Sequence, residues 1–153
     1  MEIRPWRADD QALLIAAQQD LSPNSLTSRF FTGLGTLPVK YLRYVAHAPR
    51  DKWDAEVAVH QGRLVGWAEL ARPAPGHDEA DLAVLVVDAW HRRGVATALF
   101  QALLPRAAAA GVQVVHADVD PANTAVRGLI RKIAVDGVSA RWESGLLHYK
   151  MRL

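Results

Sequence analysis

One stretch of the sequence limits the possible folds more than any other: an apolar run that gives way to a basic turn and then to a helix. Residues 79–87, EADLAVLVV, are rich in Leu and Val, which suits a strand buried on both faces. The next residues, DAWHRRG, end at Gly94, and from Val95 onward apolar residues recur at helical spacing. A buried strand followed directly by a helix predicts an α/β fold, in which helices cover a central sheet.

The other segments predict that most of this sheet is antiparallel. Further strands are expected at 3–6, 55–59, 64–71, 112–119, 138–143 and 146–153, and helices after Asp9, after Ser22, at 41–46, from Gly94 and after Asn123. Turns at 60–63 and 144–145 join neighbouring strands as hairpins. Only residues 79–119 show the strand–helix–strand order of a parallel crossover. The expected fold is therefore a mixed α/β sheet and not a doubly wound one.

Composition excludes several classes of function. The length of 153 residues favours one domain, 1–153. The absence of cysteine removes disulfides, thiolate metal sites and cysteine nucleophiles, and the six histidines lack the spacing of metal ligands, so no metal is expected. The net charge of +2, with scattered Lys and Arg, argues against a nucleic-acid partner.

Neither end of the chain nor its interior predicts a membrane segment. The first residues lack the pattern of a signal peptide. The longest apolar-looking stretch, 98–115, contains Gln101, Pro105, Arg106 and Gln113. A cytoplasmic protein is therefore expected.

The turn before the Gly94 helix predicts an anion site. Backbone N–H groups at a helix N-terminus lack intrahelical partners, and the helix dipole favours negative charge there. Gly94 and Ala96 leave room for a phosphate, and Arg92 and Arg93 add positive charge. The turn lacks the Gly-Lys-Ser/Thr of a P-loop and the Gly-x-Gly-x-x-Gly of a dinucleotide site. An ordinary helix start is the alternative, but a glycine, two arginines, a strand and a helix coincide here.

These residues resemble a known family. Residues 91–96, HRRGVA, are similar to the Gln/Arg-x-x-Gly-x-Gly/Ala motif of the GNAT superfamily of N-acetyltransferases. The resemblance extends through 3–10 (IRPWRADD), 62–66 (GRLVG) and 120–123 (DPAN). In addition, 21–31 (LSPNSLTSRFF) and 79–84 (EADLAV) look like the acetyltransferase domains of bacterial protein-lysine acetyltransferases.

The resemblance implies a GNAT-like fold, with a mostly antiparallel sheet splayed around acetyl-CoA and flanked by helices. The pantetheine arm would lie in the V-shaped opening between two strands and contact backbone groups of Leu85, Val86 and Val87. Backbone amides would hold the pyrophosphate at Arg92, Arg93, Gly94, Val95, Ala96 and Thr97. Asn123 would lie near the cofactor arm, or would simply cap the next helix.

Three positions depart from the family pattern. His91 replaces the usual Gln or Arg, and Ala134-Val135 replaces Gly-Phe. Ile130 stands where a tyrosine often protonates the departing thiolate, which leaves the general acid unassigned. The leaving thiol has a pKa of about 8 to 9 by analogy with cysteine, so a thiolate can leave without full protonation. Tyr149, the only late tyrosine, lies on the terminal hairpin and is a weak candidate.

An amine acceptor needs a base, because a lysine titrates near pH ~10.4. Asp81 is the first candidate, since the lysine acetyltransferases that the chain resembles carry a glutamate there; Glu79 and His77 are fallbacks. A solvated charge at the strand edge is the alternative for Asp81. A backbone N–H near Val86 or Val87 would stabilise the oxyanion. Arg29-Phe-Phe31 is expected to be a buried aromatic pair with a surface arginine; the alternative is that these residues line the acceptor side.

The sequence thus predicts an acetyl-CoA-dependent N-acetyltransferase that transfers the acetyl group directly to an amine, here a protein lysine. Without cysteine or a Gly-x-Ser-x-Gly elbow, a covalent acyl-enzyme is disfavoured. One alternative is the same chemistry on a small amine. The other is a catalytically weak module that binds or senses acyl-CoA. A homodimer through the terminal strands is a further possibility.

Overall fold

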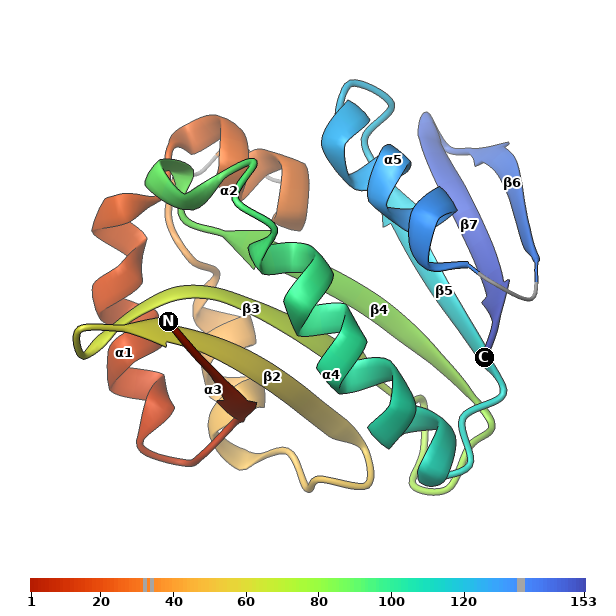
Figure 1. The fold of residues 1–153 in the computed structure, drawn as a ribbon, viewed down its shortest axis with the longest axis horizontal. Helices are drawn as coiled ribbons and strands as arrows, with labels where there is room; N and C mark the ends of the chain where they lie inside the picture. The colour runs from red at the N-terminus through yellow and green to blue at the C-terminus, as the bar shows by residue number, and fades with distance from the viewer. Residues whose placement is uncertain (32, 34, 135–136) are drawn as a thin grey trace.

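The computed structural model describes residues 1–31, 33, 35–134 and 137–153 and contains one central sheet (Figure 1). Its strands within this described part are β1 (Glu2–Pro5), β2 (Trp53–His60), β3 (Arg63–Ala71), β4 (Glu79–Val86), β5 (Val114–Val119), β6 (Val138–Glu143) and β7 (Leu146–Arg152). The helices are α1 (Asp10–Ala17), α2 (Pro23–Phe30), α3 (Val39–His47), α4 (Val95–Ala109) and α5 (Thr124–Ile133), with short 3₁₀ turns η1 (Gln18–Asp20) and η2 (Asp88–Trp90).

The sheet order is β1-β2-β3-β4-β5-β7-β6, and β4 and β5 are its one parallel pair among the described strands. This mixed, mostly antiparallel sheet with flanking helices confirms the predicted fold class. The β4–β5 pairing joins only Glu79–Asp81 to Val114–His116. Beyond Asp81 the two strands no longer pair, although each continues for several residues. The sheet is therefore split along half of its central parallel pair.

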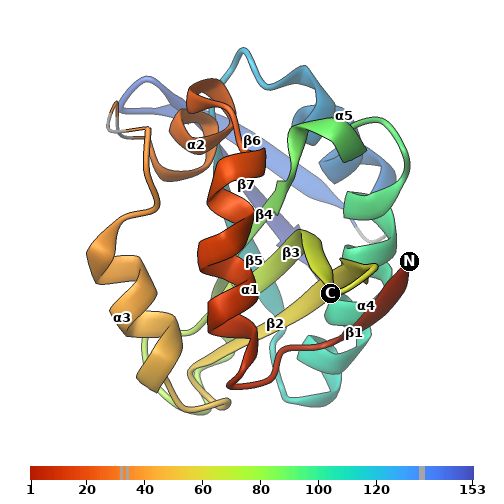
Figure 2. The ribbon, with the colours of Figure 1, turned by 90° about the vertical axis from the view of Figure 1, so that its left-hand side faces the viewer.

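Helices cover the two faces of the sheet unequally. Figure 2 shows α4 and α5 on one face and α3 on the other, with α1 packed beside it. Leu14 of α1 and Leu99 and Leu103 of α4 are fully buried against the sheet, because their spacing puts them on the inner face of each helix. Trp67 of β3 lies at the centre of this core.

Gly66 lets β3 approach the start of α4 closely. A Cβ at this position would lie 3.1 Å from Val95 Cγ1 and 3.3 Å from the Leu85 carbonyl oxygen. Any larger residue would push α4 away from the sheet. The glycine thus fixes the N-terminus of α4 directly over β3 and β4.

Two local expectations turn out differently. The α4 helix itself continues through Pro105 to Ala109. Asp9 makes no capping hydrogen bond at α1; Asp10 instead accepts a hydrogen bond from the Arg7 N–H at 2.7 Å and pairs with Arg4. Phe31 is 43% exposed, so the expected buried aromatic pair at 30–31 is wrong. Val135, one of the departures from the family pattern, lies outside the described residues.

Candidate active site

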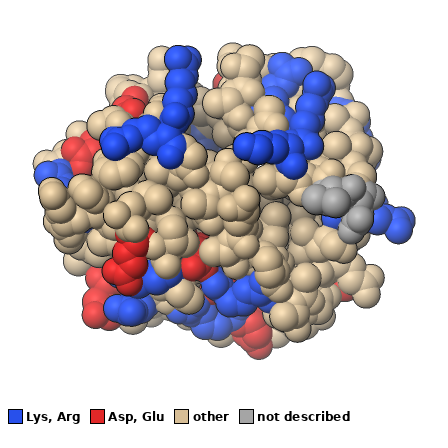
Figure 3. All heavy atoms as spheres, viewed as in Figure 1, with Lys and Arg blue, Asp and Glu red and all other residues tan. Residues whose placement is uncertain are grey.

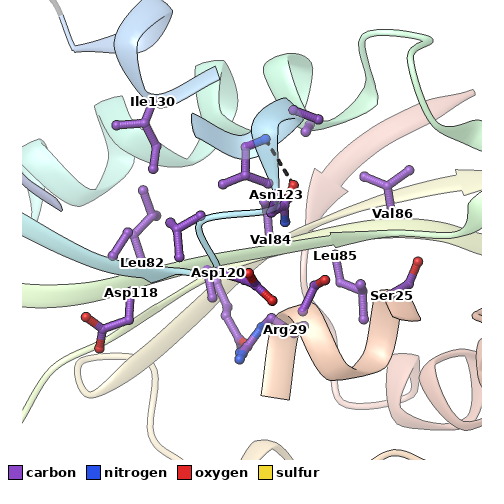
Figure 4. Close-up of a pocket in the computed structure, with 18 of the residues that line it drawn as sticks. Ser25, Arg29, Leu82, Val84, Leu85, Val86, Asp118, Asp120, Asn123 and Ile130 are labelled. Carbon is purple, nitrogen blue, oxygen red and sulfur yellow. Dashed lines mark hydrogen bonds and ion pairs between the residues drawn. The ribbon is translucent and has the colours of Figure 1, made fainter. Parts of the chain in front are cut away.

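A cleft of about 910 Å³ opens where β4 and β5 separate. Its walls come from the ends of both strands, the first turn of α4, the loop and helix of α5, and α2 (Figure 4). Side chains of β4 alternate in direction, so Leu82, Val84 and Val86 point toward α5 while Leu85 points toward α2. The split in the sheet therefore produces a cavity that passes between the two faces.

The first turn of α4 borders this cleft. Gly94 has φ +78°, in the left-handed region, and caps the helix. The first intrahelical bond from this cap runs from the Ala98 N–H to the Gly94 carbonyl at 3.0 Å. The N–H groups of Val95, Ala96 and Thr97 therefore have no intrahelical acceptor, because no earlier turn of the helix supplies a carbonyl group. All three residues line the cleft, as do Arg92 and Gly94.

Contacts on both sides fix the turn that precedes α4. The Asp88 carboxylate accepts hydrogen bonds from the Ser22 N–H at 3.0 Å and the Ser25 hydroxyl at 2.9 Å. Burial would raise the pKa of Asp88, but these hydrogen bonds outweigh it and lower the pKa. The His91 ring lies 2.8 Å from the Val86 carbonyl oxygen through Nε2. The turn is thus tied to α2 and to β4, and sequence reasoning missed the link to α2.

Basic residues surround this end of the cleft. Figure 3 shows Lys and Arg side chains on both sides of a hollow, over the β4–α4 turn and over α5. Arg92 and Arg93 are exposed on the turn, and Arg131 and Lys132 are exposed on α5. The Arg93 guanidinium lies over the Trp90 ring, 4.0 Å from its centroid, and is not part of the cleft lining. The surroundings of the free amides are therefore positively charged.

Two residues of the predicted cofactor set, Val87 and Arg93, do not line the cleft. Asn123 lines the cleft and also caps α5 by accepting a hydrogen bond from the Val126 N–H at 3.3 Å, so both readings of this residue hold in geometry. Leu85 and Val86 line the cleft, but Val87 does not. Val87 is buried, and its N–H donates to the Val65 carbonyl at 2.9 Å. The expectation that the Val87 N–H could stabilise an oxyanion is therefore wrong, because this N–H already donates to Val65.

The candidate base Asp81 lies at the point where the strands part. Asp81 and His116 form the last residue pair that joins β4 to β5. The Asp81 side chain lines the cleft. Asp81 is exposed at the strand edge, as the alternative of a solvated charge expected. Partial burial nevertheless raises the pKa of its carboxyl, and the nearby Asp118 carboxylate raises it further. His116 and His148 act in the opposite direction, but the net pKa is raised. A carboxyl group placed and shifted in this way suits proton transfer.

The two fallback bases do not line the cleft. The Glu79 carboxylate lies 3.3 Å from His116 Nε2, away from the opening. His77 Nδ1 accepts a hydrogen bond from the Glu79 N–H at 3.1 Å, which orients the start of β4. Neither residue has the access to the cavity that Asp81 has.

A buried polar network forms the floor of the cleft on the α2 side, and sequence reasoning missed it. Glu69 of β3 is buried and forms a short ion pair with Arg29 of α2. The same carboxylate accepts hydrogen bonds from the Tyr41 hydroxyl at 2.9 Å and from Trp53 Nε1 at 2.8 Å. Tyr41 in turn accepts one from Trp67 Nε1 at 2.9 Å. The sequence did contain a signal for this network, because Glu69 is a lone glutamate inside an otherwise apolar strand. A carboxylate buried in this way requires hydrogen-bond partners.

No tyrosine takes the place of Ile130, which is 1% exposed and lines the cleft. Tyr149 is buried in the core and is not part of the lining. Tyr41 and Tyr44 do line the cleft, and burial raises the pKa of Tyr41 to about 12. Within the described ranges, no three His, Asp or Glu side chains are grouped to hold a metal ion. No helix in the described part of the chain is long and apolar enough to cross a membrane.

Comparisons with known proteins agree with this geometry. The sequence model of the acetyltransferase (GNAT) family matches residues 24–134. Among solved structures, the GNAT domain of S. lividans PAT is 26% identical over 99% of this chain and 89% of its own, with a TM-score of 0.87. Ribosomal-protein-alanine N-acetyltransferase from Brucella melitensis is 23% identical over the whole of both chains, with a TM-score of 0.76.

More distant structures share the fold as well. PaiA N-acetyltransferase from Thermoplasma acidophilum, solved in complex with coenzyme A, is 14% identical over the whole of both chains, with a TM-score of 0.68. Among curated protein sequences, none matches this chain.

Proposed function

Because the chain belongs to the acetyltransferase (GNAT) family, we propose that it binds acetyl-CoA in the β4–β5 cleft and transfers the acetyl group to an amine. The observation that carries this proposal is the first turn of α4. Its unpartnered amides open onto a long cleft, at the end where arginine and lysine side chains gather. Such a turn suits a diphosphate, and the cleft beside it suits a long thioester arm.

The roles of individual residues follow from their positions. The amides of Arg92 and Gly94 to Thr97 would bind the pyrophosphate, while Arg93 would contribute charge from outside the lining. Backbone groups of Leu85 and Val86 would hydrogen-bond the pantetheine arm as a neighbouring strand does. Asn123 would contact the arm from the α5 side. Coenzyme A bound to the T. acidophilum relative supports the ligand, because that protein has the same fold.

Asp81 would act as the general base. The acceptor ammonium gives a proton to the carboxylate, and its nitrogen then attacks the acetyl carbon. The carbon–sulfur bond breaks, and the sulfur leaves with the electron pair and takes up the second proton of the attacking nitrogen. Since Asp81 must be ionised to act, kcat/KM should rise with pH through the raised pKa of this carboxyl.

Ile130 makes the cleft apolar where the departing sulfur would lie. Because a thiolate of pKa about 8 to 9 is a tolerable leaving group, no tyrosine is needed for turnover. We therefore expect slower chemistry rather than none. The alternative, a module that binds acyl-CoA without catalysis, differs from the proposal only in that it has no turnover.

A protein lysine is the proposed acceptor. The 26% identity to the GNAT domain of S. lividans PAT extends over 99% of the chain, which supports an acceptor of the kind that the sequence resemblance implies. Asp81, Asp118 and Asp120 line the cleft and favour a cationic group. A small amine satisfies the same charge requirement. A cytoplasmic location and a homodimer also stay predictions.

A thiol-release assay tests the function. The wild-type chain is incubated with acetyl-CoA and either lysine-containing proteins or small amines, beside Asp81→Asn. Release with proteins alone supports the proposed acceptor, and release with small amines alone supports the alternative. The Asp81→Asn variant should lose about a hundredfold in kcat/KM and the pH dependence below neutrality. Tight coenzyme A binding by calorimetry without any turnover would instead identify a binding module.

A further inference from the structure

A chain of titratable side chains runs across β4, β5 and β7, starting at Glu79, two residues before Asp81. Glu79 Oε1 lies 3.3 Å from His116 Nε2, and His116 Nδ1 lies 3.0 Å from His148 Nε2. His148 Nδ1 lies 2.7 Å from Asp118 Oδ1. The chain thus links β4, β5 and β7 through two imidazole rings with a carboxylate at each end.

The number of protons in this chain follows from its contacts. Each of the three contacts needs one hydrogen, and ionised carboxylates supply none. Two neutral imidazoles carry only two hydrogens on their four nitrogens. All three contacts are satisfied together only when the His116–His148 pair holds one additional proton. When the pair loses that proton, one of the two carboxylates no longer receives a hydrogen bond. Glu79 is the one expected to lose it, because its contact with His116 is longer than the contact between His148 and Asp118.

The location of the pair suits proton release. The side chains of His148 and His116 are only 17% and 22% exposed, whereas those of Asp118 and Glu79 are 53% and 40% exposed. Asp118 lines the cleft and also a second hollow of about 410 Å³, which His116 and His148 line as well. Asp118 is therefore the member of the chain that borders both the cleft and the second hollow.

Other charged groups also lie around the pair. Glu143 Oε2 of β6 lies 3.9 Å from His148 Nδ1, and Arg141 pairs with Glu143 at 3.1 Å. Lys150 follows His148 by two residues on the same face of β7. From β4, Asp81 interacts electrostatically with both histidines. Both carboxylates and basic side chains therefore surround the two rings.

We propose that the His116–His148 pair passes its shared proton to solvent beside Asp118 and then takes up the proton that Asp81 removes from the acceptor amine. This inference rests on the proposed function, because the proton arises in that reaction. An ammonium and a thioester become an amide and a thiol, so one proton must leave the enzyme for each acetyl group transferred. Asp81 must lose it before the next turnover. The two histidines act through Asp81 and do not touch the reacting atoms.

Single variants His116→Gln and His148→Gln test the relay, with His47→Gln at the exposed end of α3 as the matched control. Each relay variant should lower kcat about tenfold, leave KM for acetyl-CoA unchanged and shift the pH profile of kcat. Added imidazole buffer should restore the rate, because it can accept the proton in place of the missing ring. His47→Gln should behave as wild type. An unchanged kcat, or a loss that imidazole does not restore, overturns the relay.

A second measurement needs no turnover and so separates this inference from the proposed function. Nitrogen-15 NMR of the wild-type imidazoles, assigned with the two variants, should find three of the four ring nitrogens protonated near neutral pH. Two or four protonated nitrogens would overturn the shared proton. If the wild type releases no thiol with any amine, the proposed function fails, while the NMR result still decides whether the pair holds one extra proton.

Discussion

Glu69 shows how one buried carboxylate organises the α2 side of the cleft. Its partners come from three elements: Arg29 from α2, Tyr41 from α3 and Trp53 from β2. A buried carboxylate is tolerable only when its oxygens are fully bonded, and these donors meet that requirement. The network therefore holds α2 and α3 against β3 and fixes this wall of the cleft.

The raised pKa of Tyr41 predicts how the stability that this network contributes changes at alkaline pH. Burial raises its pKa from 10 to about 12, so Tyr41 contributes stability that is present below pH 10 and is lost as pH rises toward 12. Tyr41→Phe removes this contribution. The wild type should be more stable than the variant at pH about 9, and the gap should narrow by about 1.4 kcal/mol at pH about 11.

Urea unfolding at the two pH values measures the gap, since it gives the free energy of unfolding directly. Tyr44→Phe is the comparison: burial raises the pKa of Tyr44 as well, but Tyr44 is 36% exposed, so its gap should narrow less than that of Tyr41. A gap that stays constant, or that widens with pH, would contradict the raised pKa of Tyr41.

At the scale of elements, the β4–α4 turn depends on α2. Asp88 accepts two hydrogen bonds from the first turn of α2, through Ser22 and Ser25. Asp88→Ala should free the turn and spread the amides of the anion site. We expect coenzyme A affinity to fall about three- to tenfold, since hydrogen bonds to a charged group contribute about 1.5–3 kcal/mol and solvent replaces part of this.

Calorimetry with coenzyme A measures this loss, and circular dichroism checks that the helices remain. Asp51→Ala, an exposed carboxylate in the turn before β2, is the matched control. Equal affinities for the Asp88 variant and the wild type would show that the turn holds its shape without α2.

Local sequence patterns predicted the elements but not the contacts between them. The order of strands, the Ser22 cap and the start of α4 at Gly94 follow from periodicity and from turn residues, which act within a few positions. The Arg29–Glu69 pair, 40 residues apart, and the Ser22–Asp88 bond, 66 residues apart, depend on how the elements pack. The contact between His116 and His148 could not be predicted for the same reason, because the pairing of β5 with β7 brings the two rings together.

At the scale of the whole molecule, the cleft exists because the sheet cannot close. β4 pairs with β5 over three residues and then turns toward the Gly94 cap, while β5 continues toward Asn123. Helices α4 and α5 start from these diverging ends, so both of their N-termini border the opening. A ligand that fills the opening joins the two halves of the sheet and should stabilise the entire fold.

This linkage gives a prediction that does not require knowledge of the acceptor. Coenzyme A at a hundred times its Kd should stabilise the wild type by about 2.7 kcal/mol, a rise in Tm of about 5–10 °C. Gly94→Leu should lose most of this rise, because a side chain at the cap obstructs the diphosphate and strains the turn. Gly62→Leu is a matched control: Gly62 has φ +75° against +78° for Gly94, and no atom lies within 4 Å of a Cβ at either site.

Both leucine variants should therefore lose similar stability without ligand, since a left-handed conformation costs an L-residue about 1–2 kcal/mol. Only the Gly94 variant should fail to respond to coenzyme A, because Gly62 lies in the β2–β3 hairpin and is not part of the cleft lining. Differential scanning fluorimetry with and without coenzyme A compares the three proteins. An equal rise in Tm for both variants would mean that the ligand binds elsewhere, since backbone strain alone is the same at the two glycines.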